Sequence, residues 1–435
     1  MVLGQRQNIQ ARSGYPDRQT ALRSYFVDSR VTSEELTNSY QLTGNSQPNA
    51  GGLRVTKQLP HVLYIIDQIR QLGGAERVLI EIVQQLSRHR FRCSIVTFGV
   101  ERSLEALKNV TCPLHVFPLR RTYDFQAIKT ALQLRALIRA ENVSIVHTFF
   151  ETSDLWAAPI AKLSGRPVLI SSRRDMGILR TRKHQLAYPF VNHIFDRVLA
   201  VSDEVRSYAI NHDHLPPGKV ETLYNGVALE ELDWKTKEFD ARERLALPPN
   251  VPLVSLLANI RPVKGMDVLL RSAALVCHHF PTAVFVVAGS VLAPEAFSEL
   301  QELVTSLGLQ NNVNFVGHMP NPYPLVAASN VFCLPSRSEG FSNALIEAMA
   351  CGLPCVATDV GGNAEALQDG QQGYIIASED YQALAERTLR LLRDPRLAKE
   401  MGLAGRKRVI ERFTVNAMMT RLMQIYDDLL EAKNG

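Results

Sequence analysis

Short apolar runs alternate with longer stretches of helical periodicity from His61 onward, and this alternation constrains the fold more than any other feature. Seven runs come first and six follow a charged interruption: HVLYIID, CSIVTFG, LHVFPL, SIVHTF, PVLISS, RVLAVS and VETLYN, then PLVSLLA, AVFVVAG, VNFVGH, VFCLPS, PCVATD and GYIIA. Continuous apolar runs of this length are typical of parallel strands buried on both faces. Their alternation with helical stretches predicts an α/β fold in which helices cover both faces of a parallel sheet.

The charged interruption, LEELDWKTKEFDARERLALPPN, predicts a domain boundary because it holds no strand pattern and ends in a Pro-Pro-Asn break. A chain of 435 residues is also too long for one ordinary core. The first residues are rich in Ser, Thr, Asn, Gln and Arg, which is typical of a disordered tail. We therefore predict a tail at 1–58, a Rossmann-like domain at 59–235, a linker at 236–250, a second Rossmann-like domain at 251–414 and a final helix at 415–435.

The composition is typical of a soluble globular protein, with 46% hydrophobic and 21% charged residues. No apolar run approaches the length needed to cross a bilayer, and the N-terminal residues lack the apolar core of a secretory signal. Six cysteines in a chain of this size fit reduced thiols, so we expect a cytoplasmic protein. The formal charge of +5 is compatible with an acidic substrate or a membrane surface and does not require nucleic acid.

Two loops at predicted strand ends carry groups that bind anions. Gly73 and Gly74 follow the first apolar run and open a helix, where glycines let a phosphate or sugar approach backbone N–H groups. Arg261 and Lys264 follow PLVSLLA, where two cations are placed to neutralise a diphosphate. Taken singly, the first loop is a weak signal, because glycine pairs also occur in plain turns, and the second is better explained as a solvated surface loop.

The segment from Ser338 to Glu365 places two carboxylates at a third strand end. Glu339 lies in the loop after VFCLPS, and Glu347 lies about one turn into a helix that Ser342 or Asn343 can cap. A single Glu at such a position often only complements the helix dipole. Two of them, with the amides of Gly361 and Gly362 near the same sheet edge, favour a nucleotide site. Carboxylates there accept hydrogen bonds from ribose hydroxyls, and cations hold phosphates.

The motifs GGAER, RPVKG, E-x7-E and GGNAE occur in this order over residues 60 to 430. This arrangement resembles the retaining glycosyltransferase family 4, of GT-B fold. The resemblance implies two Rossmann-like domains that face each other across a cleft, with a last helix that crosses back to the N-terminal domain. It also implies a nucleotide-sugar donor on the C-terminal domain and a glycan or lipid-linked acceptor on the N-terminal one. Work on such acceptors would bring peripheral association with the cytoplasmic face of the inner membrane.

The resemblance assigns a role to each matching residue of the donor side. Glu347 would bind the ribose hydroxyls, Arg261 and Lys264 the diphosphate, and Glu339 the donor sugar, while Gly74 would approach the phosphate from the opposite domain. Arg261, Lys264 and Glu339 are the predicted catalytic residues. The predicted donor-binding residues are Gly73, Gly74, Arg261, Lys264, Glu339, Gly340, Phe341, Ser342, Asn343, Glu347, Gly361 and Gly362.

The acceptor side departs from the family pattern. Many members place a His after the strand that corresponds to PVLISS, and this chain has Ser-Arg-Arg-Asp there. The candidates are His147, which is also compatible with a structural hydrogen-bonding role, and Arg173 and Arg174, which are placed to contact a phosphate or acidic sugar. In the basic loop, Asn259 occupies the position where the family often has its Arg, so the family role falls more securely on Lys264 than on Arg261.

No Asp-x-Asp pair lies beside these loops, and no second Cys/His pair completes a zinc site with Cys351 and Cys355. We therefore expect transfer without a metal or cofactor, and the resemblance implies retention of anomeric configuration. Two alternatives remain at this point. One is a nucleotide-sugar epimerase of the same architecture, and the other is a non-catalytic protein that binds a sugar nucleotide.

Overall fold

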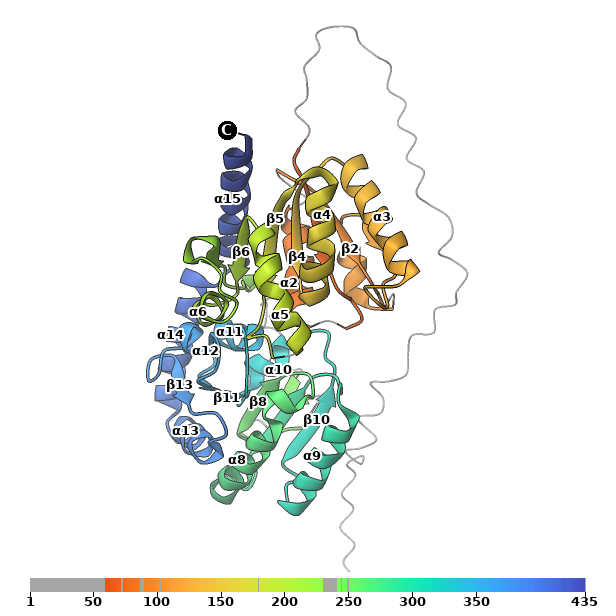
Figure 1. Ribbon diagram of the computed structural model, residues 1–435. Coiled ribbons are helices and arrows are strands. Elements are labelled where there is room, and N and C mark those ends of the chain that lie inside the picture. The colour runs from red at the N-terminus through yellow and green to blue at the C-terminus, as the bar shows by residue number, and fades with distance from the viewer. Residues whose placement is uncertain are drawn as a thin grey trace, which may run out of the picture. The chain divides into compact units, whose positions relative to one another are not determined.

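The computed structural model describes residues 59–434 except 72, 87–89, 102, 179, 230–240, 244 and 249. The predicted tail at 1–58 lies outside the described residues, as does much of the predicted linker at 236–250. The described residues all belong to one compact unit that holds two parallel sheets (Figure 1).

The first sheet has seven parallel strands in the order β3-β2-β1-β4-β5-β6-β7. Its strands are β1 His61–Ile66, β2 Arg92–Thr97, β3 Leu114–Val116, β4 Val143–Phe149, β5 Val168–Arg173, β6 Arg197–Ala200 and β7 Val220–Thr222. Its helices are α2 Gly74–Leu86, η2 Glu105–Asn109, α3 Phe125–Ala140, η3 Ser153–Ala157, α4 Ala158–Gly165, α5 Arg182–Val191, η4 Asn192–Ile194, α6 Asp203–Asn211 and η5 Pro217–Lys219. The strand order reverses at β1 and β4, which makes this a doubly wound sheet.

The second sheet has six parallel strands in the order β10-β9-β8-β11-β12-β13. Its strands are β8 Leu253–Leu257, β9 Val284–Ala288, β10 Val313–Gly317, β11 Val331–Leu334, β12 Cys355–Thr358 and β13 Gly373–Ile376. Its helices are η7 Pro262–Lys264, α8 Met266–His279, α9 Pro294–Ser306, α10 Tyr323–Ala328, α11 Asn343–Ala350, α12 Asn363–Ala366, α13 Tyr381–Arg393 and α14 Pro395–Arg412. The order reverses at β8 and β11.

Successive residues of β1 pack into two different cores, because the side chains of a strand alternate between the two faces of the sheet. Leu63 and Ile65 belong to the core that α3 and α4 cover, whereas Val62, Tyr64 and Ile66 belong to the core on the other face. The helices α2 and α15 cover that second face. Because both faces are covered, the strands are apolar throughout, which is why the sequence shows runs rather than alternation.

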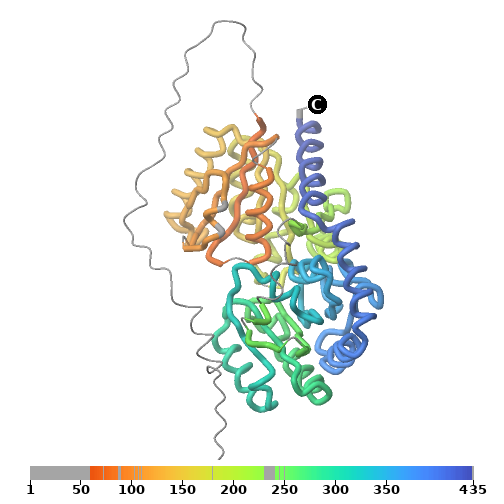
Figure 2. The backbone as a smooth tube through the Cα atoms, turned by 180° about the vertical axis from the view of Figure 1, so that it is seen from behind, coloured from red at the N-terminus to blue at the C-terminus, as the bar shows by residue number. Residues whose placement is uncertain are grey.

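The last helix, α15 Val415–Asn434, leaves the C-terminal half and runs along the N-terminal half (Figure 2). Leu422, Ile425 and Tyr426 are buried in the core beneath it, and the Tyr426 hydroxyl forms a hydrogen bond of 3.1 Å with that of Tyr64. The predicted α/β architecture, with two Rossmann-like halves and a returning helix, is confirmed. All thirteen apolar runs are strands.

Candidate active site

A cleft of about 1060 Å³ lies between the two halves, where loops from the carboxyl ends of both sheets meet. The N-terminal half contributes the start of α2 and the loop after β5, and the C-terminal half contributes the loops after β8 and β11. The predicted residues that line the cleft are Gly73, Gly74, Arg174, Arg261, Lys264, Glu339, Gly340, Phe341, Ser342, Asn343 and Glu347. The fold therefore gathers segments nearly 280 residues apart in the sequence at one place.

Lys264 and Glu339 form an ion pair within the cleft. The Lys264 Nζ lies 2.7 Å from Glu339 Oε1, and the Ser336 hydroxyl donates to the same oxygen at 2.6 Å. The Glu339 side chain is only 9% exposed and the Lys264 side chain 25%, so the pair is partly shielded from water. The loop fits there because Gly265, with a φ of +62°, brings its Cα against the Pro335 carbonyl, where a Cβ would lie 1.9 Å from the oxygen.

Glu347 lies on the first turns of α11, whose start is fixed by Ser342. The Ser342 hydroxyl accepts a hydrogen bond of 3.4 Å from the Leu345 amide, so Ser342 is the helix cap that the sequence left undecided between Ser342 and Asn343. The Glu347 side chain is half-buried at the cleft wall. The N-terminus of α11 thus lies at the cleft wall, where the partial positive charge of a helix N-terminus favours an anion.

Arg261 is an exposed cation on the same loop as Lys264 and also lines the cleft. No described residue accepts a hydrogen bond from its guanidinium. Burial raises the pKa of the Glu76 carboxyl, and Arg174 and Arg261 partly oppose that rise. Glu76, at the start of α2, is thus a half-buried carboxyl near Arg174 of its own half and Arg261 of the other half.

A chain of hydrogen bonds joins the two halves beside the cleft. The Arg174 Nη2 donates to Asn225 Oδ1 at 2.7 Å, the Asn225 Nδ2 donates to Asn343 Oδ1 at 2.6 Å, and the Asn343 Nδ2 donates to the Gly74 carbonyl at 3.4 Å. Burial lowers the pKa of Arg174 to about 10, so the side chain remains a cation at neutral pH. Arg174 therefore places a positive charge at the cleft wall, and its hydrogen-bond partner Asn225 is buried.

Gly361 and Gly362 are placed behind the Glu339 turn and are not among the residues that line the cleft. The Gly362 amide donates to the Gly340 carbonyl at 2.9 Å. A Cβ on Gly361, whose φ is +53°, would lie 2.0 Å from the Glu339 carbonyl oxygen. These glycines support the turn that carries Glu339.

His147 is buried in the N-terminal half and does not line the cleft. Its Nδ1 lies 2.7 Å from the Tyr426 hydroxyl and its Nε2 lies 2.9 Å from the Ser172 hydroxyl. Burial lowers the pKa of His147 to about 3, so the ring is neutral. Both ring nitrogens form hydrogen bonds within the protein. His147 thus has the structural hydrogen-bonding role that was one of the two alternatives in the sequence.

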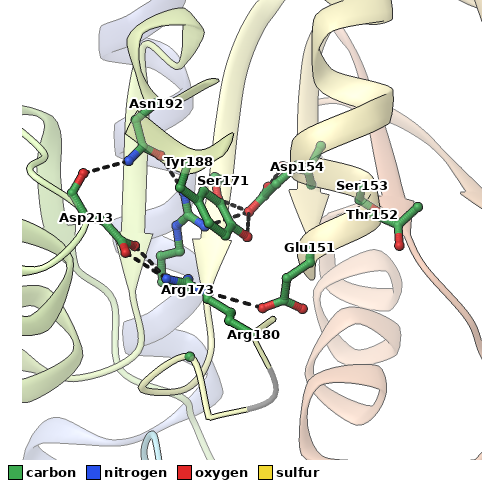
Figure 3. Close-up of polar contacts among 12 residues, drawn as sticks. Glu151, Thr152, Ser153, Asp154, Ser171, Arg173, Arg180, Tyr188, Asn192 and Asp213 are labelled. Carbon is green, nitrogen blue, oxygen red and sulfur yellow. Dashed lines mark hydrogen bonds and ion pairs between the residues drawn. The ribbon is translucent and has the colours of Figure 1, made fainter. Parts of the chain in front are cut away.

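Arg173 is also buried, although its neighbour Arg174 lines the cleft. Figure 3 shows its guanidinium among Asp154, Tyr188 and Asn192, with an ion pair of 2.9 Å to Asp154 and a hydrogen bond of 2.8 Å to Asn192. Consecutive residues at a strand end point to opposite faces, which separates the two arginines.

A side pocket of about 290 Å³ adjoins the cleft and was missed by the sequence analysis. Its lining residues are Asp67, Gln68, Glu76, Phe98, Leu119, Phe150 and Thr152, of which Gln68, Glu76 and Phe150 also line the cleft. The Asp67 carboxylate accepts hydrogen bonds from the Thr152 amide at 2.9 Å, the Ser153 amide at 2.7 Å and the Ser153 hydroxyl at 2.6 Å. Burial raises the pKa of this carboxyl, and the three donors partly oppose that rise. The signal in the sequence was the Asp that ends the run HVLYIID, because a charged residue at a buried strand end marks the edge where ligands bind.

Within the described part of the chain, no group of three or more His, Cys, Asp or Glu side chains is arranged to hold a metal ion. None of the described helices is both long and apolar enough to cross a bilayer.

Solved structures of other proteins share this fold. Anabaena HepE, solved in complex with UDP and glucose, superposes with a TM-score of 0.76 at 21% identity, over 84% of this chain and 99% of that one. The fold is therefore that of the GT-B glycosyltransferases.

The family models extend the match to the sequence. Residues 72–231 match "Glycosyltransferase Family 4" and residues 237–408 match "Glycosyl transferases group 1". The chain belongs to glycosyltransferase family 4 and is a transferase enzyme.

Two curated relatives match over most of their own length. N-acetyl-alpha-D-glucosaminyl L-malate synthase of Bacillus anthracis is 26% identical over 380 residues, which cover 84% of this chain and 96% of the relative. UDP-Gal:alpha-D-GlcNAc-diphosphoundecaprenol alpha-1,3-galactosyltransferase of Escherichia coli is 22% identical over 373 residues, which cover 83% and 95%.

Proposed function

We propose that the enzyme transfers a sugar from a nucleotide-sugar donor to a glycan or lipid-linked acceptor, without a metal and with retention of anomeric configuration. The observation that carries the proposal is the Lys264–Glu339 pair in the cleft, with Arg261 exposed on the same loop as Lys264. The cleft has cations on the loop after β8 and carboxylates after β11. This combination suits a ligand with a diphosphate and two sugar rings.

In this proposal each group of the donor side has one task. Glu347 accepts hydrogen bonds from the ribose hydroxyls, and Arg261 and Lys264 neutralise the diphosphate. Glu339 contacts the donor sugar, and its pairing with Lys264 holds that cation where negative charge develops. The names of the relatives support such a donor, since one acts with UDP-Gal and HepE was solved with UDP and glucose.

The chemical step exchanges one bond for another at the anomeric carbon. The acceptor oxygen forms a bond to this carbon, the bond from the carbon to the diphosphate oxygen breaks, and the diphosphate leaves with the electron pair. The acceptor proton passes to the departing phosphate oxygen, so no protein base is required. Arg261, Lys264 and the α11 N-terminus stabilise the charge that the diphosphate gains.

The acceptor approaches from the N-terminal half in this proposal. Arg174 brings a cation to the cleft, and the side pocket beside Glu76 adds room lined by Phe98 and Phe150. One relative named above is by name a synthase of an L-malate conjugate and the other acts on a diphosphoundecaprenol-linked sugar, which supports both small and lipid-linked acceptors as candidates.

The test is donor turnover by an Arg261→Ala/Lys264→Ala variant, measured as release of the nucleoside diphosphate. Removal of one preorganised group that stabilises such charge lowers rates by about 10²–10³, and we expect at least that loss in the double variant. The matched control is Arg271→Ala, which removes an exposed cation from α8. Unchanged turnover in the double variant would contradict the assignment. Product analysis separates the alternatives: an epimerase converts the donor without an acceptor, and a non-catalytic binder releases no diphosphate.

A further inference from the structure

One contact between the two halves is made by residues that do not line the cleft. The Glu365 carboxylate, in the C-terminal half, accepts hydrogen bonds from the Asp203 amide at 2.7 Å and from the Glu204 amide at 2.9 Å. These amides belong to the first turn of α6 in the N-terminal half, so α12 and α6 lie side by side (Figure 1). Glu365 ends the motif GGNAE, and the donor-side roles leave this carboxylate without a task.

The carboxylate satisfies donors that α6 cannot satisfy by itself. The first amides of a helix have no partner within it and carry a partial positive charge. The Ser202 hydroxyl accepts a hydrogen bond from the Val205 amide at 3.2 Å, and Glu365 accepts from the two amides before it. Each carboxylate oxygen takes one amide, Oε2 that of Asp203 and Oε1 that of Glu204. Two charge-assisted hydrogen bonds fix the direction of the side chain as well as its distance.

The helix α12, which carries Glu365, is bound firmly to its own half. The Arg408 guanidinium of α14 donates to the Glu365 carbonyl at 2.7 Å and to the Ala366 carbonyl at 2.8 Å. The buried Asn363 side chain donates to the Thr358 carbonyl, at the end of β12, at 3.1 Å. A movement of α6 relative to α12 would therefore break the Glu365 hydrogen bonds rather than be taken up by α12.

The residues before α12 connect this contact to the cleft. A Cβ on Gly362 would lie 2.7 Å from the Ser202 Cβ, at the start of α6, and 2.6 Å from the Phe341 Cδ2. The Gly362 amide donates to the Gly340 carbonyl at 2.9 Å, and Phe341 lines the cleft. The start of α6, the loop before α12 and the turn that carries Glu339 are thus in direct contact.

Tyr224 adds an aromatic link between α6 and the same turn. Its hydroxyl donates to the Asp203 carboxylate at 3.0 Å, and its ring centroid lies 5.1 Å from that of Phe341. Phe413, between α14 and α15, completes the cluster at 5.4 Å from Tyr224 and 5.2 Å from Phe341. Burial raises the pKa of Tyr224, and the Glu365 and Asp203 carboxylates raise it further, so the hydroxyl remains a donor.

We propose that Glu365 is a positioning residue, which sets the N-terminal half against the turn that carries Glu339 by capping α6. The proposal rests on the proposed transfer reaction, in which Glu339 contacts the donor sugar and the acceptor approaches from the N-terminal half. The distance between the reacting atoms then depends on how the two halves meet, and small misplacements lower the rate by large factors. Glu365 does not line the cleft, so its effect reaches the ligand through the turn.

Hydrogen exchange of the full chain, measured without ligand, tests whether the contact positions the turn. Glu365→Ala removes the acceptor of the Asp203 and Glu204 amides, and exchange there should rise at least about tenfold, because a hydrogen bond to a charged group is worth that factor or more. We also expect faster exchange at 338–346, which covers the turn and the start of α11. A change confined to Asp203 and Glu204 would show a plain helix cap and would overturn the proposal.

Turnover of UDP-, GDP- or ADP-glucose, measured as release of the nucleoside diphosphate, tests the effect on the reaction. Glu365→Ala should lower kcat at least about tenfold and change the donor KM less than about twofold, because Lys264 and Glu347 stay in place on the C-terminal half. Glu365→Gln keeps one oxygen that accepts a hydrogen bond and should recover part of this rate. An unchanged kcat in Glu365→Ala, or a higher donor KM without a fall in kcat, would contradict the positioning role.

The matched control is Glu302→Ala, which removes an exposed carboxylate from α9 and should match the wild type in exchange and turnover. Circular dichroism melting should place the Tm of every variant well above the assay temperature. A fall in kcat that only follows unfolding at that temperature would assign Glu365 to stability and overturn the proposal. If the wild type turns over none of the three sugars, the proposed donor reaction fails on its own, because the exchange result still decides whether Glu365 positions the turn.

Discussion

Lys264 and Glu339 show what an ion pair in a cleft can do for a transferase. A fully exposed pair of this kind contributes little to stability, but here the carboxylate fixes the cation at 2.7 Å and Ser336 fixes the carboxylate. In the proposed function, an incoming diphosphate would meet a cation that is already oriented, which would reduce the ordering that binding requires. The adjacent Arg261 has no described hydrogen-bond acceptor and remains available to the ligand.

Glu347 should affect donor binding more than the chemical step. A hydrogen bond to a charged group is worth about 1.5–3 kcal/mol, so Glu347→Gln should raise the donor KM roughly tenfold or more. Because the ribose is remote from the anomeric carbon and is bound equally in ground and transition states, kcat should change little. Steady-state kinetics over a range of donor concentrations measures this split. A large fall in kcat at unchanged KM would contradict the ribose role.

His147 gives the fold a defined sensitivity to acid. Its pKa is about 6.5 when unfolded and is lowered to about 3 by burial, so the unfolded state binds more protons between these values. The stabilising contribution is therefore complete above pH 6.5 and is lost as the pH falls toward 3, by about 2 kcal/mol at pH 5.

Urea unfolding at pH 7.5 and pH 5 measures this effect. His147→Gln, which keeps polar atoms near Tyr426 and Ser172 but cannot titrate, should be less stable than the wild type at pH 7.5 and should lose less stability on acidification. An identical loss in both proteins would show that other groups dominate in this pH range.

At the scale of elements, the predicted strands are confirmed because a covered parallel sheet leaves continuous apolar runs. At the C-terminus, Pro395 is the first residue of α14 and Phe413 is its C-terminal cap, in line with the preference of proline for the first helical position. The cap of α11 remained undecided between two neighbours, and only its hydrogen-bond geometry identifies Ser342.

Side-chain direction at strand ends could not be predicted in the same way. Arg173 and Arg174 are adjacent in sequence, yet one meets Asp154 in the interior and the other lines the cleft. His147 finds its partner Tyr426 at a distance of 279 positions along the chain. Gly361 and Gly362 support the Glu339 turn through contacts that form only because the loop after β12 packs against this turn in the folded protein. Such pairings depend on tertiary packing, which one sequence does not encode locally.

The turn before α11 packs tightly against the N-terminal half, and this contact is testable. A Cβ on Gly340 would lie 2.0 Å from the Arg174 carbonyl oxygen and 2.8 Å from its carbonyl carbon. Gly340→Ala should therefore displace α11 from the loop after β5, with a loss of about 1–3 kcal/mol in unfolding free energy and a larger fractional loss of activity. Denaturant unfolding and donor turnover measure the two effects.

Gly218→Ala is the matched control for this variant, because nothing lies within 4 Å of its added Cβ. We expect that control to retain wild-type stability and turnover. If Gly340→Ala also behaved like the wild type, the two halves would not need this close contact.

At the scale of the whole molecule, the two halves depend on one another for the site. The N-terminal half supplies Gly74, Glu76 and Arg174, and the C-terminal half supplies the ion pair and α11. The returning helix α15 and the hydrogen-bond chain through Asn225 and Asn343 tie the halves together on two sides. In the proposed function, this arrangement would present a donor held by one half to an acceptor held by the other, as direct transfer requires.

The central claim is that this cleft binds a nucleotide sugar through Arg261 and Lys264. A thermal-shift series with UDP-, GDP- and ADP-sugars tests it most directly, because a ligand of the folded state stabilises by about 2.7 kcal/mol at 100 times its Kd. We predict that one nucleotide series raises the Tm of the wild type and of Arg271→Ala, and fails to raise that of Arg261→Ala/Lys264→Ala. No rise with any nucleotide sugar, or an equal rise in the double variant, would contradict the account.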